Sequence, residues 1–296
     1  MVDYKDLAVM AGDWLLSDEV ILTSEPDAPV AHWPLDTNFN DISANSLHGT
    51  PSGATLISDP CRGQVATFDG VDDYVVEDVN SPLLDFGTGN WSVCAWVKTT
   101  MLGTDGDEDK GVIYAKGGDH DGGIRYGLYV NEEQDTPGRI TLITDDDDAD
   151  KFMVDSSVVV SDGEWHHVVG LRDVNDLHVY IDGILDGTND NVPVGYDLSG
   201  TSQHKAYIGT ITDNRDASLY KFFEGSIDDV RIYDYALSDA EVAYLAVEGA
   251  DILHIPVDSI ANIYNEELEG SQWVNFKDFA ELAYDWLIEE PKWPPE

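Results

Sequence analysis

Trp165-His-His-Val-Val-Gly-Leu-Arg172 and Leu177-His-Val-Tyr-Ile-Asp-Gly183 are two short apolar runs that follow each other closely in the chain. Their valine, isoleucine and aromatic content is typical of β-strands. The Asp182-Gly183 pair that ends the second run is a strong signal for a tight hairpin turn. This stretch therefore predicts strands over residues 165–172 and 177–181, with a hairpin turn after the second.

Short strands of this kind recur from about residue 30 to residue 247, with Gly and Asp at the turns and little helical periodicity. Residues 238–247 begin with a Ser238 and Glu241 capping-box pair and predict one short helix that closes the domain. The predicted fold is an all-β, antiparallel, two-sheet jelly-roll sandwich. The other predicted strands are 65–68, 74–76, 91–97, 111–116, 126–131, 139–144, 206–209 and 226–233.

The two ends of the chain repeat one sequence. Residues 2–15 and 274–287 are identical at eight of fourteen positions, and each copy has the apolar spacing of an amphipathic helix. One such helix is marginal alone in water, so each copy should pack against a partner. Either the copies pair within one chain, or the last helix of one molecule meets the first helix of the next and builds a filament or ring. The predicted contact residues are Tyr4, Leu7, Met10, Trp14, Leu15, Phe276, Phe279, Leu282, Trp286 and Leu287.

Both terminal copies resemble half of a type I dockerin-like repeat, in which a calcium loop leads into a helix. The first copy has no room upstream for the loop, and the second has Gln272 where the loop requires Gly. The resemblance therefore implies the helices rather than the calcium loops. The predicted domains are a helix at 1–17, a linker at 18–29, the jelly roll at 30–248, a linker at 249–273, and a helix with a tail at 274–296.

Six stretches of the central region occur in the order found in one family. They are Ala31–Asp36, Phe68–Val75, Trp91–Val97, Gly163–Val169, Val179–Gly183 and Phe223–Val242. Together they resemble the laminin-G-like (concanavalin A-like, pentraxin-related) jelly-roll domains, over about two-thirds of the chain. The resemblance supports the sandwich fold and leaves function open, because this fold hosts lectins, adhesion modules, enzymes and spacers.

The same resemblance implies one structural Ca²⁺ site. In the wider family, an acid at the start of the last long strand often joins backbone oxygens from the first strands around the ion. The matching groups here are Asp228, Asp36 and the Asp69-Gly70 turn, with Asp72 or Asp41 nearby. The alternative is that Asp228 or Asp229 pairs with Arg231 or caps a turn.

The chain has two cysteines, Cys61 and Cys94, which permit a disulfide without requiring one. Pentraxins carry a cysteine where Cys94 stands, but the position of its usual partner, near residues 168–169, holds valine here. The resemblance leaves a Cys61–Cys94 disulfide and two buried thiols as alternatives.

The charge balance limits the partners. The chain has 59 acidic residues against 15 Lys and Arg residues, a net charge of −44. Self-repulsion of this size destabilises a compact state, so bound divalent cations or external salt should offset it. Nucleic acid and anionic membranes are poor partners, and no apolar run is long enough for a membrane span. Acidic runs at 105–109, 119–121 and 145–150 either lie in solvent or supply Ca²⁺ ligands.

Catalytic motifs are absent from the sequence. The E-x-D-x-E pattern of related jelly-roll glucanases, Gly-x-Ser-x-Gly and His-Glu-x-x-His do not occur, so we expect no enzymatic activity. His166 and His167 are predicted to be structural, because no third ligand stands at metal spacing. Tyr196, Tyr220 and Phe222 stand in loop-like stretches, where aromatic rings either pack or stack on sugars.

Two functions compete on these observations. The first is a non-catalytic structural or adhesion protein of the extracellular surface: a Ca²⁺-stabilised jelly roll that self-associates through its terminal helices, head to tail into a filament in one arrangement. The alternative is a carbohydrate-binding, lectin-like module of a larger secreted protein. Glycans are partners in the alternative, and a second copy of the chain is the partner in the first.

Overall fold

The computed structural model describes residues 20–102, 110–120, 123–132, 137–146, 151–200, 204–249 and 252–254. It divides into one compact unit of residues 23–251 and a second that combines residues 1–22 with 252–296. The terminal repeats, with all ten predicted contact residues, lie outside the described residues. The acidic run at 105–109 and most of the run at 145–150 lie outside them too.

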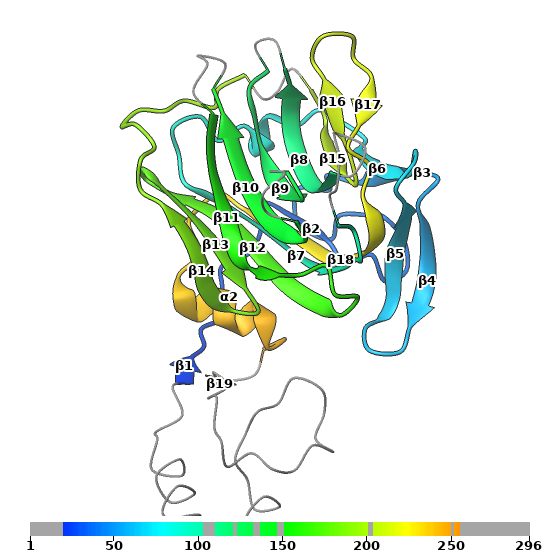
Figure 1. Cartoon of the computed structure of the whole chain (residues 1–296), viewed down its shortest axis with the longest axis horizontal. Helices are drawn as coiled ribbons and strands as arrows, with labels where there is room; N and C mark the ends of the chain where they lie inside the picture. The colour runs from blue at the N-terminus through cyan, green and yellow to red at the C-terminus, as the bar shows by residue number, and fades with distance from the viewer. Residues whose placement is uncertain are drawn as a thin grey trace, which may run out of the picture. The chain divides into compact units, whose positions relative to one another are not determined.

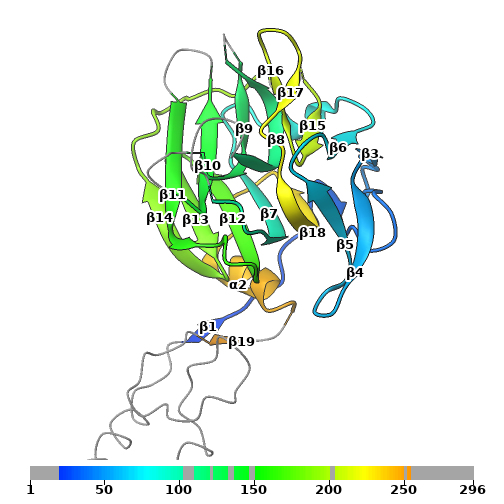
Figure 2. The ribbon, with the colours of Figure 1, turned by 45° about the vertical axis from the view of Figure 1, so that its right-hand side comes forward.

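The larger unit is a sandwich of two sheets that face each other (Figures 1 and 2). The nine-stranded sheet has the order β11-β10-β9-β8-β15-β6-β3, and a β16–β17 hairpin joins it through a parallel pairing of β16 with β8. All its other pairings are antiparallel. Its strands are β3 (Gly49–Ser52), β6 (Tyr74–Glu77), β8 (Gly111–Asp119), β9 (Arg125–Val130), β10 (Arg139–Asp145), β11 (Lys151–Val159), β15 (Ala206–Ile208), β16 (Ile211–Asp213) and β17 (Leu219–Tyr220).

The eight-stranded sheet has the order β14-β13-β12-β7-β18-β5-β4, with β2 paired to β18, and all its pairings are antiparallel. The fold-class prediction is thus confirmed for the larger unit. The strands are β2 (Ala31–Trp33), β4 (Thr55–Asp59), β5 (Gly63–Asp69), β7 (Trp91–Lys98), β12 (Trp165–Asp173), β13 (Asp176–Ile181), β14 (Ile184–Asn189) and β18 (Glu224–Tyr233).

The core lies between the two sheets because alternate residues of each strand point inward. On β7, Val93, Ala95 and Val97 are fully buried in it. Trp91 packs against Tyr126 of β9 with ring centroids 4.7 Å apart, so aromatic rings join the layers. A 3₁₀ turn, η1 (Pro82–Leu84), supplies the backbone oxygen of Leu84 that accepts the Tyr126 hydroxyl at 2.9 Å.

The outer face of the eight-stranded sheet is covered by α2 (Asp239–Ala246), the short helix that the sequence predicted at this position in the chain. The predicted capping box is present: the Ser238 amide donates to the Glu241 carboxylate at 2.8 Å, and the Glu241 amide donates back to Ser238 Oγ at 3.4 Å. Apolar side chains fill the space between helix and sheet. They are Cys94, Val169, Leu171, Tyr180, Tyr233, Leu237, Val242 and Leu245.

In the smaller unit, β1 (Val20–Leu22) pairs antiparallel with β19 (Ile252–His254), with Val20 opposite His254. This pairing brings the segment that follows the first repeat beside residues 252–254, which stand twenty positions before the second repeat. Among the residues that the structure describes, no helix is long and apolar enough to cross a lipid bilayer.

Candidate functional site

The predicted calcium ligands do not meet in one place. Asp69 pairs with Glu224 on β18, and Asp228 stands four residues further along that strand. At about 3.3 Å per residue, the two positions are roughly 13 Å apart. The predicted ligand set is therefore split between the β5–β6 turn and the middle of β18.

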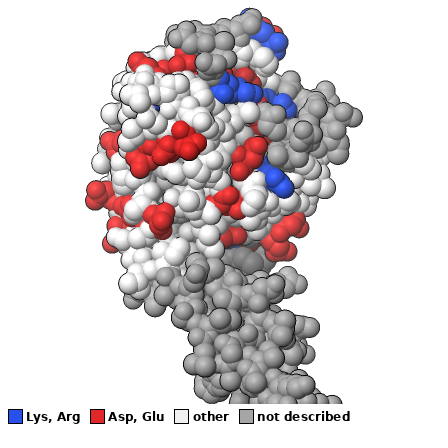
Figure 3. Space-filling model, turned by 60° about the vertical axis from the view of Figure 1, so that its left-hand side comes forward, with Lys and Arg blue, Asp and Glu red and all other residues white. Residues whose placement is uncertain are grey.

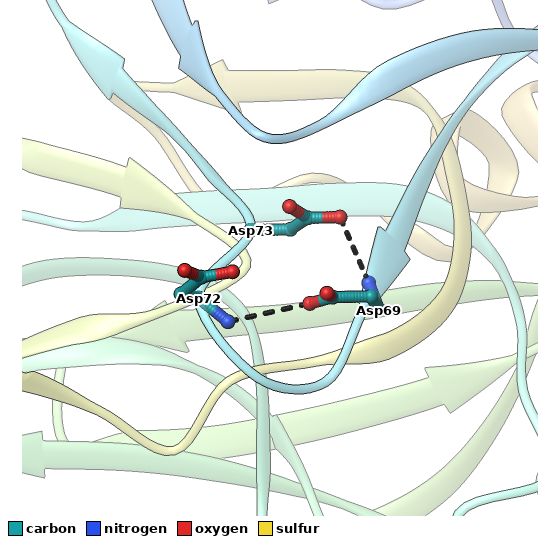
Figure 4. Close-up of side chains that lie close together, drawn as sticks. All are labelled: Asp69, Asp72 and Asp73. Atoms are coloured by element: carbon teal, nitrogen blue, oxygen red, sulfur yellow. Dashed lines mark hydrogen bonds between the residues drawn. The ribbon is translucent and has the colours of Figure 1, made fainter.

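Three carboxylates gather in the β5–β6 turn (Figure 4). Ligand oxygens of Asp69, Asp72 and Asp73 lie within 4.8 Å of one another. Asp69 Oδ1 accepts the amides of Val71 at 2.9 Å and Asp72 at 3.3 Å, and these bonds hold the pKa of Asp69 below its usual value. Burial, with the charge of Asp69, raises the pKa of Asp73. The turn offers the oxygen chemistry that Ca²⁺ prefers, although the carboxylates of Asp69 and Asp73 also accept amides within the turn.

Of the remaining predicted ligands, Asp41 and Asp228 have other partners. Asp41 is buried, and it accepts the amides of His32 at 2.8 Å and Leu47 at 2.6 Å, so it organises its own loop. Asp228 is buried and accepts Arg62 Nε at 2.8 Å, and Asp36 is exposed. Burial raises the pKa of Asp228 to about 6 in spite of Arg62. The alternative to a calcium site was that Asp228 or Asp229 pairs with Arg231. The structure shows this pairing for Asp229, whose carboxylate lies 2.8 Å from Arg231.

The two cysteines are both free, so the disulfide alternative is wrong. Cys61 is exposed in the turn between β4 and β5, whereas Cys94 is buried on β7 beneath α2. The alternative of two buried thiols therefore holds for Cys94 alone. Burial raises the pKa of the Cys94 thiol well above its usual value.

His166 and His167 have structural contacts. His166 Nδ1 bonds Asp182 Oδ2 at 2.8 Å. His167 is buried with its ring 5.3 Å from Trp96, and burial lowers its pKa to about 4. A neutral, buried imidazole packed against an indole indicates a structural role for His167.

A cluster of charged side chains and one tyrosine lies on the nine-stranded sheet, beside β8, β9 and the β16–β17 hairpin. We call it the Asp119 cluster. Its members are Asp119, Arg125, Glu132, Asp213, Tyr220 and Lys221, of which all but the half-buried Tyr220 are at most 5% exposed.

Lys221 links the cluster. Its ammonium group donates to Asp119 Oδ2 at 2.8 Å and to Glu132 Oε1 at 2.9 Å, and it lies 5.4 Å from the ring centroid of Tyr129. Arg125 pairs with the other oxygen of Asp119. Burial alone would raise the pKa of Asp119, but Arg125 and Lys221 hold it well below its usual range. The carboxylate therefore stays ionised although it is buried.

Two further features accompany the charges of the Asp119 cluster, although both also occur elsewhere in the described residues. His120, Asn131 and Lys221 have backbone φ angles of +65°, +61° and +56°, in the left-handed region that costs most residues energy. No described residue hydrogen-bonds the buried Oε2 of Glu132. Buried polar atoms usually have partners, so an unpartnered oxygen beside strained backbone suggests a site that a ligand or water completes.

An aromatic pair borders the Asp119 cluster. The rings of His120 and Tyr220 lie 5.4 Å apart and tilted by 33°, and about 32% of the His120 side chain is exposed. The Tyr220 hydroxyl donates to Asp119, which fixes the ring position. Of the other two loop aromatics, Tyr196 is buried against Phe152 and lies beside Arg172, and Phe222 is half-buried.

The Asp119 cluster was not predicted from the sequence as a unit. Its members come from four chain segments. Of these, the sequence analysis named only the acidic run at 119–121, as a candidate Ca²⁺ loop, and Tyr220, as a loop aromatic. Acidic side chains are spread over the face in Figure 3, while Lys and Arg are few and gather toward one end. The few cations are a possible signal, because a buried Lys or Arg in a chain with 59 acids is expected to pair with an acid, although Arg172 donates to three backbone oxygens instead.

Solved structures share this fold. Domain 4 of AbnA, an extracellular GH43 arabinanase from Geobacillus stearothermophilus solved with arabinotriose, aligns with a TM-score of 0.55 and 20% identity, over 77% of this chain and 100% of that domain. The binding domain of Paraclostridial Mosquitocidal Protein 1 aligns with a TM-score of 0.56 and 14% identity, over 74% of this chain and 52% of that one. The botulinum neurotoxin serotype C1 binding domain aligns with a TM-score of 0.52 and 12% identity, over 76% of this chain and 52% of that one. This chain thus spans about half the length of the two toxin domains.

No curated protein matches the chain by sequence. Residues 69–243 match the family Laminin_G_3, described as the concanavalin A-like lectin/glucanases superfamily. The match covers more than half of the chain and runs through both sheets, from the β5–β6 turn to helix α2. The chain therefore belongs to the Laminin_G_3 family of concanavalin A-like domains.

Proposed function

We propose that this protein is a non-catalytic carbohydrate-binding module that acts outside the cell, and that the His120–Tyr220 pair with the Asp119 cluster forms its binding site. The observation that carries the proposal is a partly exposed aromatic pair held in place by a buried charged network with an unpartnered carboxylate oxygen. Aromatic faces suit the apolar faces of sugar rings, and fixed polar atoms suit their hydroxyls.

The comparisons support this reading over a purely structural role. The arabinanase domain was solved with arabinotriose, and a related serotype C toxin is described as depending on two ganglioside molecules for cell entry. At 20% and 13% identity these proteins share only the fold with this chain, so their ligands are a precedent and no more.

The charge pattern favours neutral sugars over acidic ones. Lys221 and Arg125 are already paired with carboxylates, and the exposed Arg215 pairs with Asp213 at 3.0 Å. A sialylated or sulfated glycan would meet a chain with a net charge of −44. Repulsion of this kind lowers association rates and affinity for anions.

The test is a glycan array of neutral plant and bacterial oligosaccharides, arabinotriose included, next to sialylated and sulfated glycans. Binding to a neutral class is expected, and calorimetry should then give its Kd. Tyr220→Ala and His120→Ala should each weaken binding tenfold or more, about 1.4 kcal/mol.

Tyr244→Ala is the matched control, because Tyr244 is a half-buried tyrosine on α2, away from the Asp119 cluster. It should leave the Kd unchanged. Circular dichroism of all three variants checks folding. Failure of every glycan to bind, or equal loss in Tyr220→Ala and Tyr244→Ala, would contradict the proposed site.

Calcium and self-association stay predictions. The β5–β6 turn, with Asp69, Asp72 and Asp73, would supply carboxylate ligands, and a chelator should then lower the melting temperature at low salt. The β1–β19 pairing supports the intrachain arrangement of the terminal repeats. Light scattering of the chain with and without residues 1–16 distinguishes that arrangement from a filament.

A further inference from the structure

Three strands bring a lysine and a glutamate together inside the sandwich. Lys116 on β8 pairs with Ala206 on β15, and the amide of Ala206 donates to Glu77 Oε2 at 3.2 Å. Strand β15 lies between β8 and β6 (Figure 1), so Lys116 and Glu77 flank it on its two sides. Their charged groups meet across β15, with Lys116 Nζ 3.4 Å from Glu77 Oε2.

This pair is among the most buried charge pairs in the described part of the chain. The Lys116 side chain is 0% exposed and that of Glu77 is 1% exposed. Trp33, Val75 and Tyr114 line the small cavity beside Glu77. Burial lowers the pKa of Lys116, although Glu77 opposes the shift. A buried amine of this kind reaches its neutral, nucleophilic form more easily than a lysine in water.

The carboxamide of Asn80 contacts the Lys116–Glu77 pair. The Ser81 amide donates to Glu77 Oε1 at 2.8 Å, which folds the chain after β6 back over the end of the strand. Asn80 is exposed as a residue, yet its Oδ1 lies 2.5 Å from Lys116 Nζ. The carboxamide carbon of Asn80 is one bond beyond that oxygen, so an amine, an amide and a carboxyl group share one site.

We propose that Lys116 and Asn80 join through an intramolecular amide bond, with Glu77 as the proton carrier. The bond would cross-link β8 to the loop after β6, across the intervening β15. It is independent of glycan binding at the Asp119 cluster.

The reaction balances without any co-reactant. A proton moves from the Lys116 ammonium to the Glu77 carboxylate and leaves a neutral amine. Its nitrogen attacks Cγ of Asn80, and the carbonyl electron pair moves onto Oδ1. Glu77 then protonates Nδ2 of Asn80 and takes back a proton from the attacking nitrogen. The carbonyl re-forms, the Cγ–Nδ2 bond breaks and ammonia leaves through the exposed side of Asn80.

The experiment is intact-mass spectrometry of the folded full chain, followed by peptide mapping. The expected mass is lower than that of the sequence by one ammonia molecule. The map should contain one branched peptide that joins Lys116 to Asn80, with no tryptic cleavage after Lys116. Lys116→Arg, Asn80→Ala and Glu77→Gln should each restore the unreacted mass.

Lys205→Arg is the matched control. Lys205 also binds this loop, through the backbone oxygen of Asp78 at 2.9 Å, but it is half-buried, whereas Lys116 is fully buried. The mass loss should persist in this variant. If a site variant does not fold, the map of the unchanged protein decides alone.

An unreacted mass in the folded protein, or a linear peptide ending at Lys116, overturns the proposal. A succinimide at Asn80-Ser81 has the same mass loss. It would persist in Lys116→Arg and would yield only linear peptides, and that result also overturns the cross-link.

Discussion

The two sheets are both covered on their outer faces, but by opposite chemistry. On the eight-stranded sheet, α2 and apolar side chains such as Val169, Leu171 and Leu245 form the contact. On the nine-stranded sheet, the β16–β17 hairpin borders Val112 and Tyr129, and the Asp119 cluster places buried charges beside them. Apolar burial stabilises a fold directly, whereas buried ion pairs recover their desolvation cost only with good geometry.

This difference teaches where to look for function. Apolar packing explains the contact of α2 with its sheet, although the same sheet also carries the buried Asp228 and His167. The opposite face retains ionised groups, left-handed backbone at His120 and Lys221, and an unpartnered oxygen on Glu132. Features that cost stability tend to persist where the molecule uses them.

The strongest way to break the comparison is to remove one charge from the Asp119 cluster. Lys221→Met keeps the length and apolar stem of the side chain but leaves Asp119 and Glu132 without their shared cation. We expect a loss of about 3–5 kcal/mol in the free energy of unfolding, measured by urea denaturation. Lys205→Met on the surface should stay within about 0.5 kcal/mol of the wild type. Equal stability of the two variants would mean that Asp119 and Glu132 do not depend on the charge of Lys221.

The polar part of the eight-stranded face can be tested by pH. Burial lowers the pKa of His167 to about 4 from 6.5, so only the unfolded chain binds this proton between those values. Stability should therefore fall as the pH drops from 7 to 4, whereas Asp228, with its pKa raised to about 6, acts in the opposite direction.

Comparison with His167→Gln isolates the histidine. Between pH 7 and pH 4, the wild type should lose about 3 kcal/mol more free energy of unfolding than the variant loses. Urea melts across this range provide the measurement, and the two curves should run parallel from pH 7 to 8. Parallel curves down to pH 4 would show that His167 accepts a proton in the folded state.

The smallest expected effect concerns how α2 begins. Ser238→Ala removes one half of the capping box and should cost about 1 kcal/mol, measured by urea denaturation. Adding Glu241→Ala should cost less than the sum of the two single changes, because the two residues act as a pair. Ser52→Ala, at an exposed position of β3, provides the reference. A strictly additive double variant would contradict the reciprocal cap.

The sequence was most informative in the middle of each sheet and least informative at the edges. All ten predicted strands are present, among them β7, β12 and β18. The four strands at the sheet edges, β3, β4, β11 and β14, were not predicted. β11 has only two buried residues among nine, so its apolar alternation is weak. Edge strands have one neighbour, and their residues carry less of the pattern that predicts a strand.

The predicted site residues fared differently for a related reason. Asp69 and Asp72 do meet, in one turn, because they are three residues apart. Asp228 and Asp69 were joined through the family resemblance, and the register of β18 against β5 separates them. Nothing local in the sequence reports such a register.

What the sequence by itself determined is the sandwich, the helix with its cap, and the absence of known catalytic motifs. Each of these rests on residues close together in the chain, whose spacing reflects the strand or helix they form. Only the tertiary structure decided that Asp119 meets Lys221 and Glu132, and that Lys116 meets Glu77 and Asn80. Those contacts join residues up to 102 positions apart. Strand order and register create them, and they arise from the packing of the whole core.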